Sequence, residues 1–152
     1  MQIALDQGLE RSALPSAKRS SEESIDLALR ALLQRHDIDW VITAGYLKKI
    51  GPLTLAAFDN RVINIHPSLL PKYGGQGMYG RHVHEAVIAA GERESGASVH
   101  YVNACFDSGA VIAQSSIAIN EGMTAEALAE RVLKVEHALL LSTLKGLLNV
   151  NE

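Results

Sequence analysis

The sequence is poor in the residues that mark several specialised protein classes. It has one cysteine, Cys105, which excludes an internal disulfide framework and a multi-cysteine zinc site. Positive charge is not in excess, since 14 Lys and Arg face 17 Asp and Glu, so the surface has no global attraction for nucleic acid or acidic membranes. No apolar run approaches the roughly 18 residues of a membrane span, and the start lacks a signal-peptide pattern. We therefore expect a cytoplasmic protein with no nucleic-acid and no membrane partner.

What is present suits one ordinary globular domain over residues 1–152. Hydrophobic residues make up 47% of the chain and charged residues 20%, which excludes a disordered or fibrous chain. Hydrophobic periodicity predicts helices at 21–36, from 52, at 81–90 and at 124–148, and strands at 40–44, 62–66, 97–102 and 110–119. Ser20 and Glu23 have the spacing of a capping box at the first helix. This order indicates an α/β domain with a largely parallel sheet, although the last two strands can also pair as a hairpin.

Two polar residues interrupt an otherwise apolar strand. Asn64 and His66 lie two positions apart in Val62–His66, so their side chains point to the same face. Ligand sites of open α/β sheets lie at the carboxyl ends of strands, where an amide and an imidazole can stabilise an oxyanion and transfer a proton. A buried asparagine–histidine pair with a purely structural role fits the same spacing equally well.

Several other motifs favour structural explanations on their own. Asp107 stands in an Asp-Ser-Gly turn, where an acid often only shapes the backbone. His82 and His84 are two apart in a predicted helix and do not face one ligand, so we expect no metal site. The glycine-rich stretch 74–77 is typical of a mobile loop more than of a phosphate cradle. Cys105 lacks an activating base and is expected to be a packed loop residue.

A longer stretch carries a more specific signal. The ten residues Asn64-Ile-His-Pro-Ser-Leu-Leu-Pro-Lys-Tyr73 resemble the signature of the folate-dependent formyltransferases. Within that family the chain is similar to the branch that formylates glycinamide ribonucleotide in purine biosynthesis. The resemblance extends to residues 44–47, 98–102, 107–109, 111–114 and 136–137. It implies a three-layer α/β fold with a mostly parallel sheet.

The resemblance also implies roles for individual residues. The family's catalytic asparagine, histidine and aspartate correspond to Asn64, His66 and Asp107, and His100 would support them. The reaction implied is formyl transfer from 10-formyltetrahydrofolate, the co-substrate, to a primary amine, with no metal. Asn64 would bind the formyl oxygen, His66 would donate a proton or positive charge, and Asp107 would help to move the proton from the amine.

Two further groups of residues follow from the resemblance as ligand contacts. The amine substrate would contact Pro67 and Glu136, although a solvated helix charge also accounts for Glu136. The folate would lie against two segments, represented by Tyr46, Leu47, Lys48 and Ile50 and by Asn103, Ala104, Cys105 and Phe106. The partners implied are therefore small-molecule substrates.

The first twenty residues depart from the family pattern. Met1–Ser20 contains nothing like the family's Gly-x-Gly-Ser-Asn phosphate turn, and we interpret the chain as an N-terminally truncated formyltransferase domain. Residues 1–8 are expected to be the tail of a helix and residues 10–15 a short edge strand. Three hypotheses follow: an impaired transformylase, a formyltransferase completed by a partner or using another amine, or a non-catalytic folate-binding protein. We expect a homo-oligomer that binds reduced folate better than glycinamide ribonucleotide.

Overall fold

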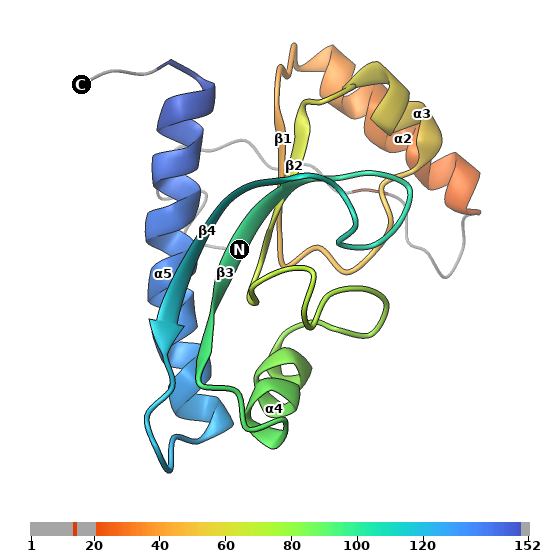
Figure 1. The fold of residues 1–152 in the computed structure, drawn as a ribbon. Coiled ribbons are helices and arrows are strands. Elements are labelled where there is room, and N and C mark those ends of the chain that lie inside the picture. Colours follow the sequence, from red (N-terminus) through yellow and green to blue (C-terminus); the bar gives the residue numbers. More distant parts are fainter. Residues whose placement is uncertain (1–13, 15–20, 150–152) are drawn as a thin grey trace, which may run out of the picture.

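A computed structural model of the chain describes residue 14 and residues 21–149. The segments predicted at 1–8 and 10–15 lie outside the described residues, apart from Leu14, which has no regular structure. The elements follow one another as helices and strands in the predicted order (Figure 1). They are α2 (Glu22–Arg35), β1 (Val41–Ala44), α3 (Pro52–Ala57), β2 (Val62–His66), α4 (Arg81–Ala89), β3 (Glu94–Tyr101), β4 (Val111–Ala118) and α5 (Ala125–Leu147).

The described strands form one mixed sheet in the order β1-β2-β3-β4. Strands β1 and β2 pair in parallel, whereas the β2–β3 and β3–β4 pairs are antiparallel. The expectation of a mostly parallel sheet therefore does not hold for these four strands. For the β3–β4 pair the physical reason is the connecting segment, which is too short for the crossover that parallel neighbours need. The hairpin alternative is the one that the structure adopts.

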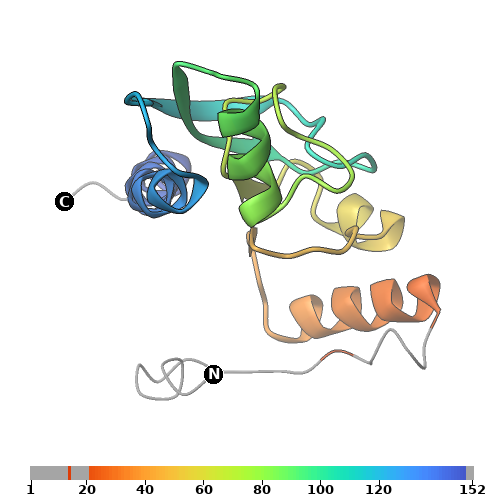
Figure 2. The same ribbon diagram turned by 90° about the horizontal axis from the view of Figure 1, so that it is seen from below.

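The sheet lies between two helical layers, as the three-layer prediction requires (Figures 1 and 2). On one face, Ile63, Ile65 and Val99 pack with Leu139 of α5 in a buried cluster. On the other face, Val62 packs against Phe58 and the half-buried apolar residues of α2. Alternate residues of β2 thus contact different layers, as the period of two in a strand dictates.

The longest helix, α5, matches its predicted amphipathic pattern. The Thr124 hydroxyl caps its start by accepting a hydrogen bond from the backbone N–H of Ala127. Leu128, Val132 and Leu139, which follow helical spacing along one side of this helix, are buried and fix the helix on the sheet. Within the described part of the chain, no helix combines the length and the apolar character that crossing a membrane requires.

Strand β1 is more exposed than its apolar sequence predicts. A short apolar run such as 40–44 is typical of a strand buried on both faces, whereas the inferred truncation predicts that this strand has an unpaired flank. Only Thr43 of β1 is buried, and Ile42 is 41% exposed. Among the described strands, β1 is one of the two edge strands and pairs only with β2. A short apolar run specifies a strand, but it does not say which neighbours cover that strand.

The start of α2 differs by one residue from the predicted capping box. Ser21 is the N-cap, and its hydroxyl accepts a hydrogen bond from the backbone N–H of Ser24 at 3.2 Å. Ser20 lies outside the described residues. The only buried residue of α2 is the charged Asp26, which lies among half-buried apolar neighbours.

Asp26 supplies the N-terminal cap that α3 lacks locally. The N-cap residue Gly51 has no side chain to accept a hydrogen bond, and the Asp26 carboxylate accepts one from the backbone N–H of Leu53 at 2.8 Å and of Thr54 at 3.0 Å. The Thr54 hydroxyl donates to the same carboxylate. A negative charge at a helix N-terminus also interacts favourably with the helix dipole. Asp26 thus ties α2 to the helix that follows β1.

We expect Asp26→Ala to lower the free energy of unfolding by about 2–4 kcal/mol, because two buried donors and one partly buried donor lose their acceptor. Urea denaturation of the wild type and the variant measures this difference. Gln34→Ala, at an exposed position of the same helix, is the matched control and should change stability by less than about 0.5 kcal/mol. Equal midpoints for the two variants would show that the Asp26 cap contributes nothing.

Candidate functional site

Four polar residues of β2 and β3 share the face of the sheet that α5 does not cover. Asn64 and His66 alternate with Ile63 and Ile65, which pack on the α5 side. In the antiparallel register, Asn64 lies opposite His100 and His66 lies opposite Ser98. Cross-strand partners point to the same face, so His100 joins Asn64 and His66 directly. This places the predicted supporting histidine beside two of the predicted catalytic residues.

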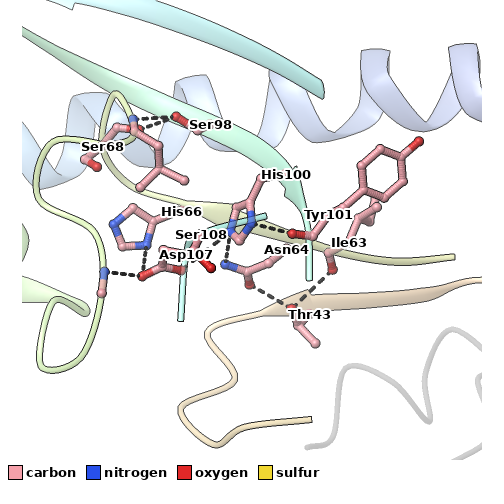
Figure 3. Close-up of polar contacts among 12 residues, drawn as sticks. Thr43, Ile63, Asn64, His66, Ser68, Ser98, His100, Tyr101, Asp107 and Ser108 are labelled. Carbon is pink, nitrogen blue, oxygen red and sulfur yellow. Dashed lines mark hydrogen bonds and ion pairs between the residues drawn. The ribbon is translucent and has the colours of Figure 1, made fainter. Parts of the chain in front are cut away.

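The third predicted catalytic residue, Asp107, reaches the same point from the loop between β3 and β4 (Figure 3). Its Oδ2 lies 3.5 Å from His66 Nδ1, and its Oδ1 lies 3.5 Å from His100 Nε2. The backbone N–H of Gly75 donates to Oδ2 at 2.9 Å. Burial opposes ionisation of Asp107, but the contacts with His100, Gly75 and His66 outweigh it, so the pKa of the carboxyl lies below its usual value. Asp107 is therefore ionised at neutral pH.

His66 is enclosed between two acceptors. Its Nε2 donates to the Tyr73 carbonyl at 2.8 Å, because a carbonyl oxygen can only accept, and its Nδ1 faces Asp107. Burial lowers the pKa of His66, and the Tyr73 carbonyl and Asp107 offset this only in part. The imidazole is therefore mainly neutral at pH 7, with an acid beside it that stabilises a positive charge when one forms.

A chain of hydrogen bonds runs from β3 across β2 to β1 (Figure 3). His100 Nδ1 lies 2.8 Å from the Tyr101 carbonyl oxygen, and His100 Nε2 lies 3.1 Å from Asn64 Nδ2. The Thr43 hydroxyl donates to Asn64 Oδ1 at 2.8 Å. His100 is 2% exposed, so little water competes for these bonds. The Asn64 amide is thus held from both ends.

A narrow pocket of about 50 Å³ adjoins this cluster. Asn64, His100 and Asp107 line it together with residues of both predicted folate-binding segments. Six of the eight predicted folate contacts border the pocket: Tyr46, Lys48, Ile50, Asn103, Cys105 and Phe106. Leu47, which is 60% exposed, and Ala104 do not border it. The Lys49 ammonium lies 5.4 Å from the centroid of the Phe106 ring, so the two segments touch across the pocket.

Three further predicted residues, Pro67, Glu136 and Cys105, make no hydrogen bond or ion pair with the cluster of Asn64, His66, His100 and Asp107 within the described part of the chain. Pro67 directly follows His66 at the end of β2. Glu136 is half-buried on α5, where burial raises the pKa of its carboxyl, and no hydrogen bond or ion pair within the described residues links it to the other site residues. Cys105 is exposed, so the expectation of a packed loop residue is wrong; its loop projects from the sheet and lines the pocket.

Sequence reasoning missed the function of the glycine-rich loop as a support for Asp107. The Gly75 N–H binds the carboxylate, and a Cβ on Gly74 would lie 2.5 Å from Leu70 Cδ2 and 3.2 Å from Asp107 Cβ. A Cβ at position 74 would therefore force the buried Leu70 side chain to shift. Thr43 was missed as well, because nothing in an apolar strand marks one threonine as a partner of the next strand's asparagine.

The buried histidines predict how stability depends on pH. His84 of α4 is also buried, and burial, then the nearby His66, lower its pKa. Both imidazoles titrate below the ordinary value of 6.5 when folded, so the unfolded chain binds more protons between the two values. The free energy of unfolding is therefore at its full value above pH 6.5. It decreases as the pH falls below 6.5, by up to about 1.4 kcal/mol per pH unit for each histidine.

Urea denaturation between pH 5 and 8 measures this dependence. We expect a plateau above neutrality, a decline in acid, and a shallower decline for His84→Gln. His82→Gln, at an exposed position of the same helix, is the control and should keep the wild-type slope. A stability that rises on acidification would contradict the assigned direction.

Comparison with known proteins places this geometry in context. A family model described as formyl transferase matches residues 4–144. The chloroplastic phosphoribosylglycinamide formyltransferase of Arabidopsis thaliana is 41% identical over 139 residues, which cover 91% of this chain and 48% of the relative. The phosphoribosylglycinamide formyltransferase of Bacillus subtilis is 36% identical, over 86% of this chain and 65% of the relative. The chain thus spans about half the length of the plant relative.

Two solved structures support the same relation. The phosphoribosylglycinamide formyltransferase of Bacillus halodurans superimposes with a TM-score of 0.89 at 34% identity, over 99% of this chain and 75% of that one. The protein of the same name from Streptococcus pneumoniae gives a TM-score of 0.87 at 32% identity, over 97% of this chain and 79% of that one. The α/β fold class expected from the resemblance is therefore confirmed.

Proposed function

The chain belongs to the formyl transferase family, and we propose that it transfers a formyl group from 10-formyltetrahydrofolate to the primary amine of glycinamide ribonucleotide. The relatives named above carry this activity in their names. The observation that carries the proposal is the cluster of Asn64, His66, His100 and Asp107 beside a pocket that both predicted folate segments line. Both substrates of this reaction are small molecules. We retain from the sequence the prediction of a cytoplasmic homo-oligomer.

The lining of the pocket fits a reduced folate in its chemistry. Ile50, Val102 and Phe106 offer apolar surface to a flat ring, and Lys48 and Lys49 offer positive charge to the carboxylates that a folate carries. When bound, this co-substrate supplies the formyl group. Ligand pockets usually measure about 300–1,000 Å³, so the narrow pocket has to widen, and the Lys49–Phe106 contact has to open as a ring enters.

Asn64 is suited to stabilise negative charge on the formyl oxygen. Its side-chain nitrogen carries two N–H groups, and only one of them is engaged, with His100. The second is available to an oxygen in the pocket that Asn64 borders. A fixed donor aimed at developing charge lowers the barrier because it needs no reorganisation during the reaction.

Asp107 and His66 are suited to manage the proton that the attacking amine loses. Asp107 is ionised and lies within 3.5 Å of both imidazoles, so it stabilises a positive charge on either ring. A water held by this carboxylate would carry the proton from the attacking amine to N10 of the departing tetrahydrofolate, so that the transfer needs no other proton donor. His66, which faces the Oδ2 atom of Asp107, would contribute a proton or a positive charge.

Release of tetrahydrofolate in the presence of different acceptors tests the proposed reaction. Purified chain and 10-formyltetrahydrofolate are mixed with glycinamide ribonucleotide, with glycinamide alone, or with buffer, and the absorbance change is followed. We expect release that depends on the ribonucleotide, with little in buffer. Equal release in buffer would indicate hydrolysis, and no release from folded chain would contradict the proposal.

A further inference from the structure

We propose that Lys49 is a specificity-determining residue, which favours folates through the negative charge of their glutamate tail. This inference rests on the proposed function and deepens it, because it names the part of the folate that the exposed side of the pocket recognises. Three observations carry it: the unequal burial of the residues that line the pocket, the lack of an acidic partner for two of its lysines, and the contact between Lys49 and Phe106.

The pocket has a buried side and an exposed side. Asn64, His100 and Asp107 line the buried side, where the side chains of His100 and Asp107 are 2% and 11% exposed. Lys48 and Lys49 line the same pocket but are exposed, and we call this side the mouth. A carboxylate loses hydration when it is buried, and the ionised Asp107 repels it. The carboxylates of a bound ligand therefore lie at the mouth.

The positive charge at the mouth has no acidic partner in the described part of the chain. Neither ammonium group there forms an ion pair with a described residue. Asp107 is the one acidic side chain among the described residues that line the pocket, and it faces His66 and His100. The exposed Lys72, by contrast, is paired with Glu92 at 2.9 Å. Two neighbouring cations at the mouth are thus available to an anionic ligand.

The Phe106 ring holds the Lys49 ammonium at the mouth. The Nζ atom lies 5.4 Å from the ring centroid, which is within the range of a cation–π contact, and such a contact is weak at an exposed site. A folate ring that enters the pocket has to open this contact. A carboxylate on the ligand then replaces Phe106 as the partner of the ammonium. A neutral ligand of the same shape opens the contact without replacing it, so it binds less tightly.

Tetrahydrofolate and its diamide separate the effect of charge from that of shape. Tetrahydrofolate is the product of the proposed reaction and carries two carboxylates on its glutamate, and in the diamide both are neutral amides of similar size. Titration calorimetry under anaerobic conditions gives both dissociation constants, and their ratio is the selectivity. We expect the wild type to bind tetrahydrofolate about tenfold tighter than the diamide, since one exposed ion pair contributes up to about fivefold and two lysines are present.

Substitutions at position 49 assign this selectivity to one side chain. Lys49→Met has a similar length without the charge, and it should reduce the selectivity to about threefold while the Kd of the diamide stays within about twofold of the wild type. Lys49→Arg keeps the charge and should retain the wild-type selectivity. Lys134→Met, at an exposed position of α5 that does not line the pocket, is the matched control and should retain it as well. High salt should narrow the wild-type selectivity, because it screens exposed charges.

The possible outcomes separate this inference from the proposed function. Equal selectivity in the wild type and Lys49→Met, an equal loss of affinity for both ligands in Lys49→Met, or a loss in Lys49→Arg as large as in Lys49→Met would each overturn the inference. A wild type that shows the expected selectivity but transfers no formyl group would contradict the proposed reaction alone. A folded wild type that binds neither ligand would overturn both.

Discussion

Asn64→Ala is expected to lower kcat for formyl transfer by about 10²–10³-fold, the usual cost of removing one donor to a developing oxyanion. The substitution removes the side-chain amide that lines the pocket and lies 3.1 Å from His100 Nε2. The folate KM should change little, because the donor acts mainly when the oxygen becomes charged. Steady-state rates at saturating substrates measure the effect.

Asn120→Ala provides the matched control, because this asparagine is exposed in the loop that follows β4. We expect it to keep the wild-type kcat. Asn64 lies in the middle of β2, so its substitution can also destabilise the fold. Circular dichroism and urea denaturation of both variants therefore check that each is folded under the assay conditions. A folded Asn64→Ala protein with a kcat within about threefold of the wild type would rule out the assigned role.

The second large effect is expected for Asp107→Asn, which preserves shape and removes charge. We expect kcat to fall by about 10²–10⁴-fold, the range that general acid–base groups contribute. The amide would place a neutral group where His66 and His100 now face a carboxylate, and its N–H groups compete with the Gly75 donor for the same space. Proton transfer from the amine would lose its acceptor.

The pH dependence of the wild-type rate adds a check on Asp107. Its pKa lies below the ordinary 3.8, so its protonation should not reduce kcat until the solution is more acidic than that value. The exposed Asp39 gives the matched variant Asp39→Asn, which should retain the wild-type rate at every pH. If Asp107→Asn and Asp39→Asn were equally active, Asp107 would have no part in the reaction.

Local patterns in the sequence predicted the parts of the site that depend on local geometry. The period of two in a strand placed Asn64 and His66 on one face before any fold was known. The starts predicted at 52 and 124 agree with α3 and α5, because Pro52 suits the first turn of a helix and the Thr124 hydroxyl caps one. The place of Asp107 came instead from the resemblance to a family, because an Asp-Ser-Gly turn has no distinguishing local feature.

The supports of the site could not be predicted, because they join residues far apart in the chain. Thr43 and Asn64 are 21 residues apart, Asp26 and Thr54 are 28 apart, and Gly75 and Asp107 are 32 apart. No helical or strand period links such positions. The antiparallel direction of the β2–β3 pair was missed because the apolar pattern of a strand does not indicate its direction relative to a neighbour.

The position of a bound folate tests the central claim most directly. That claim is that formyl transfer occurs where Asn64, His100 and Asp107 border the pocket. The measurement is a crystal structure of the chain with a reduced folate that carries a non-transferable group at N10. We expect the ring between the segments of Tyr46–Ile50 and Asn103–Phe106, with the N10 substituent within hydrogen-bond distance of Asn64 Nδ2. A folate bound elsewhere, or one whose N10 points away from Asn64 and Asp107, would contradict the account.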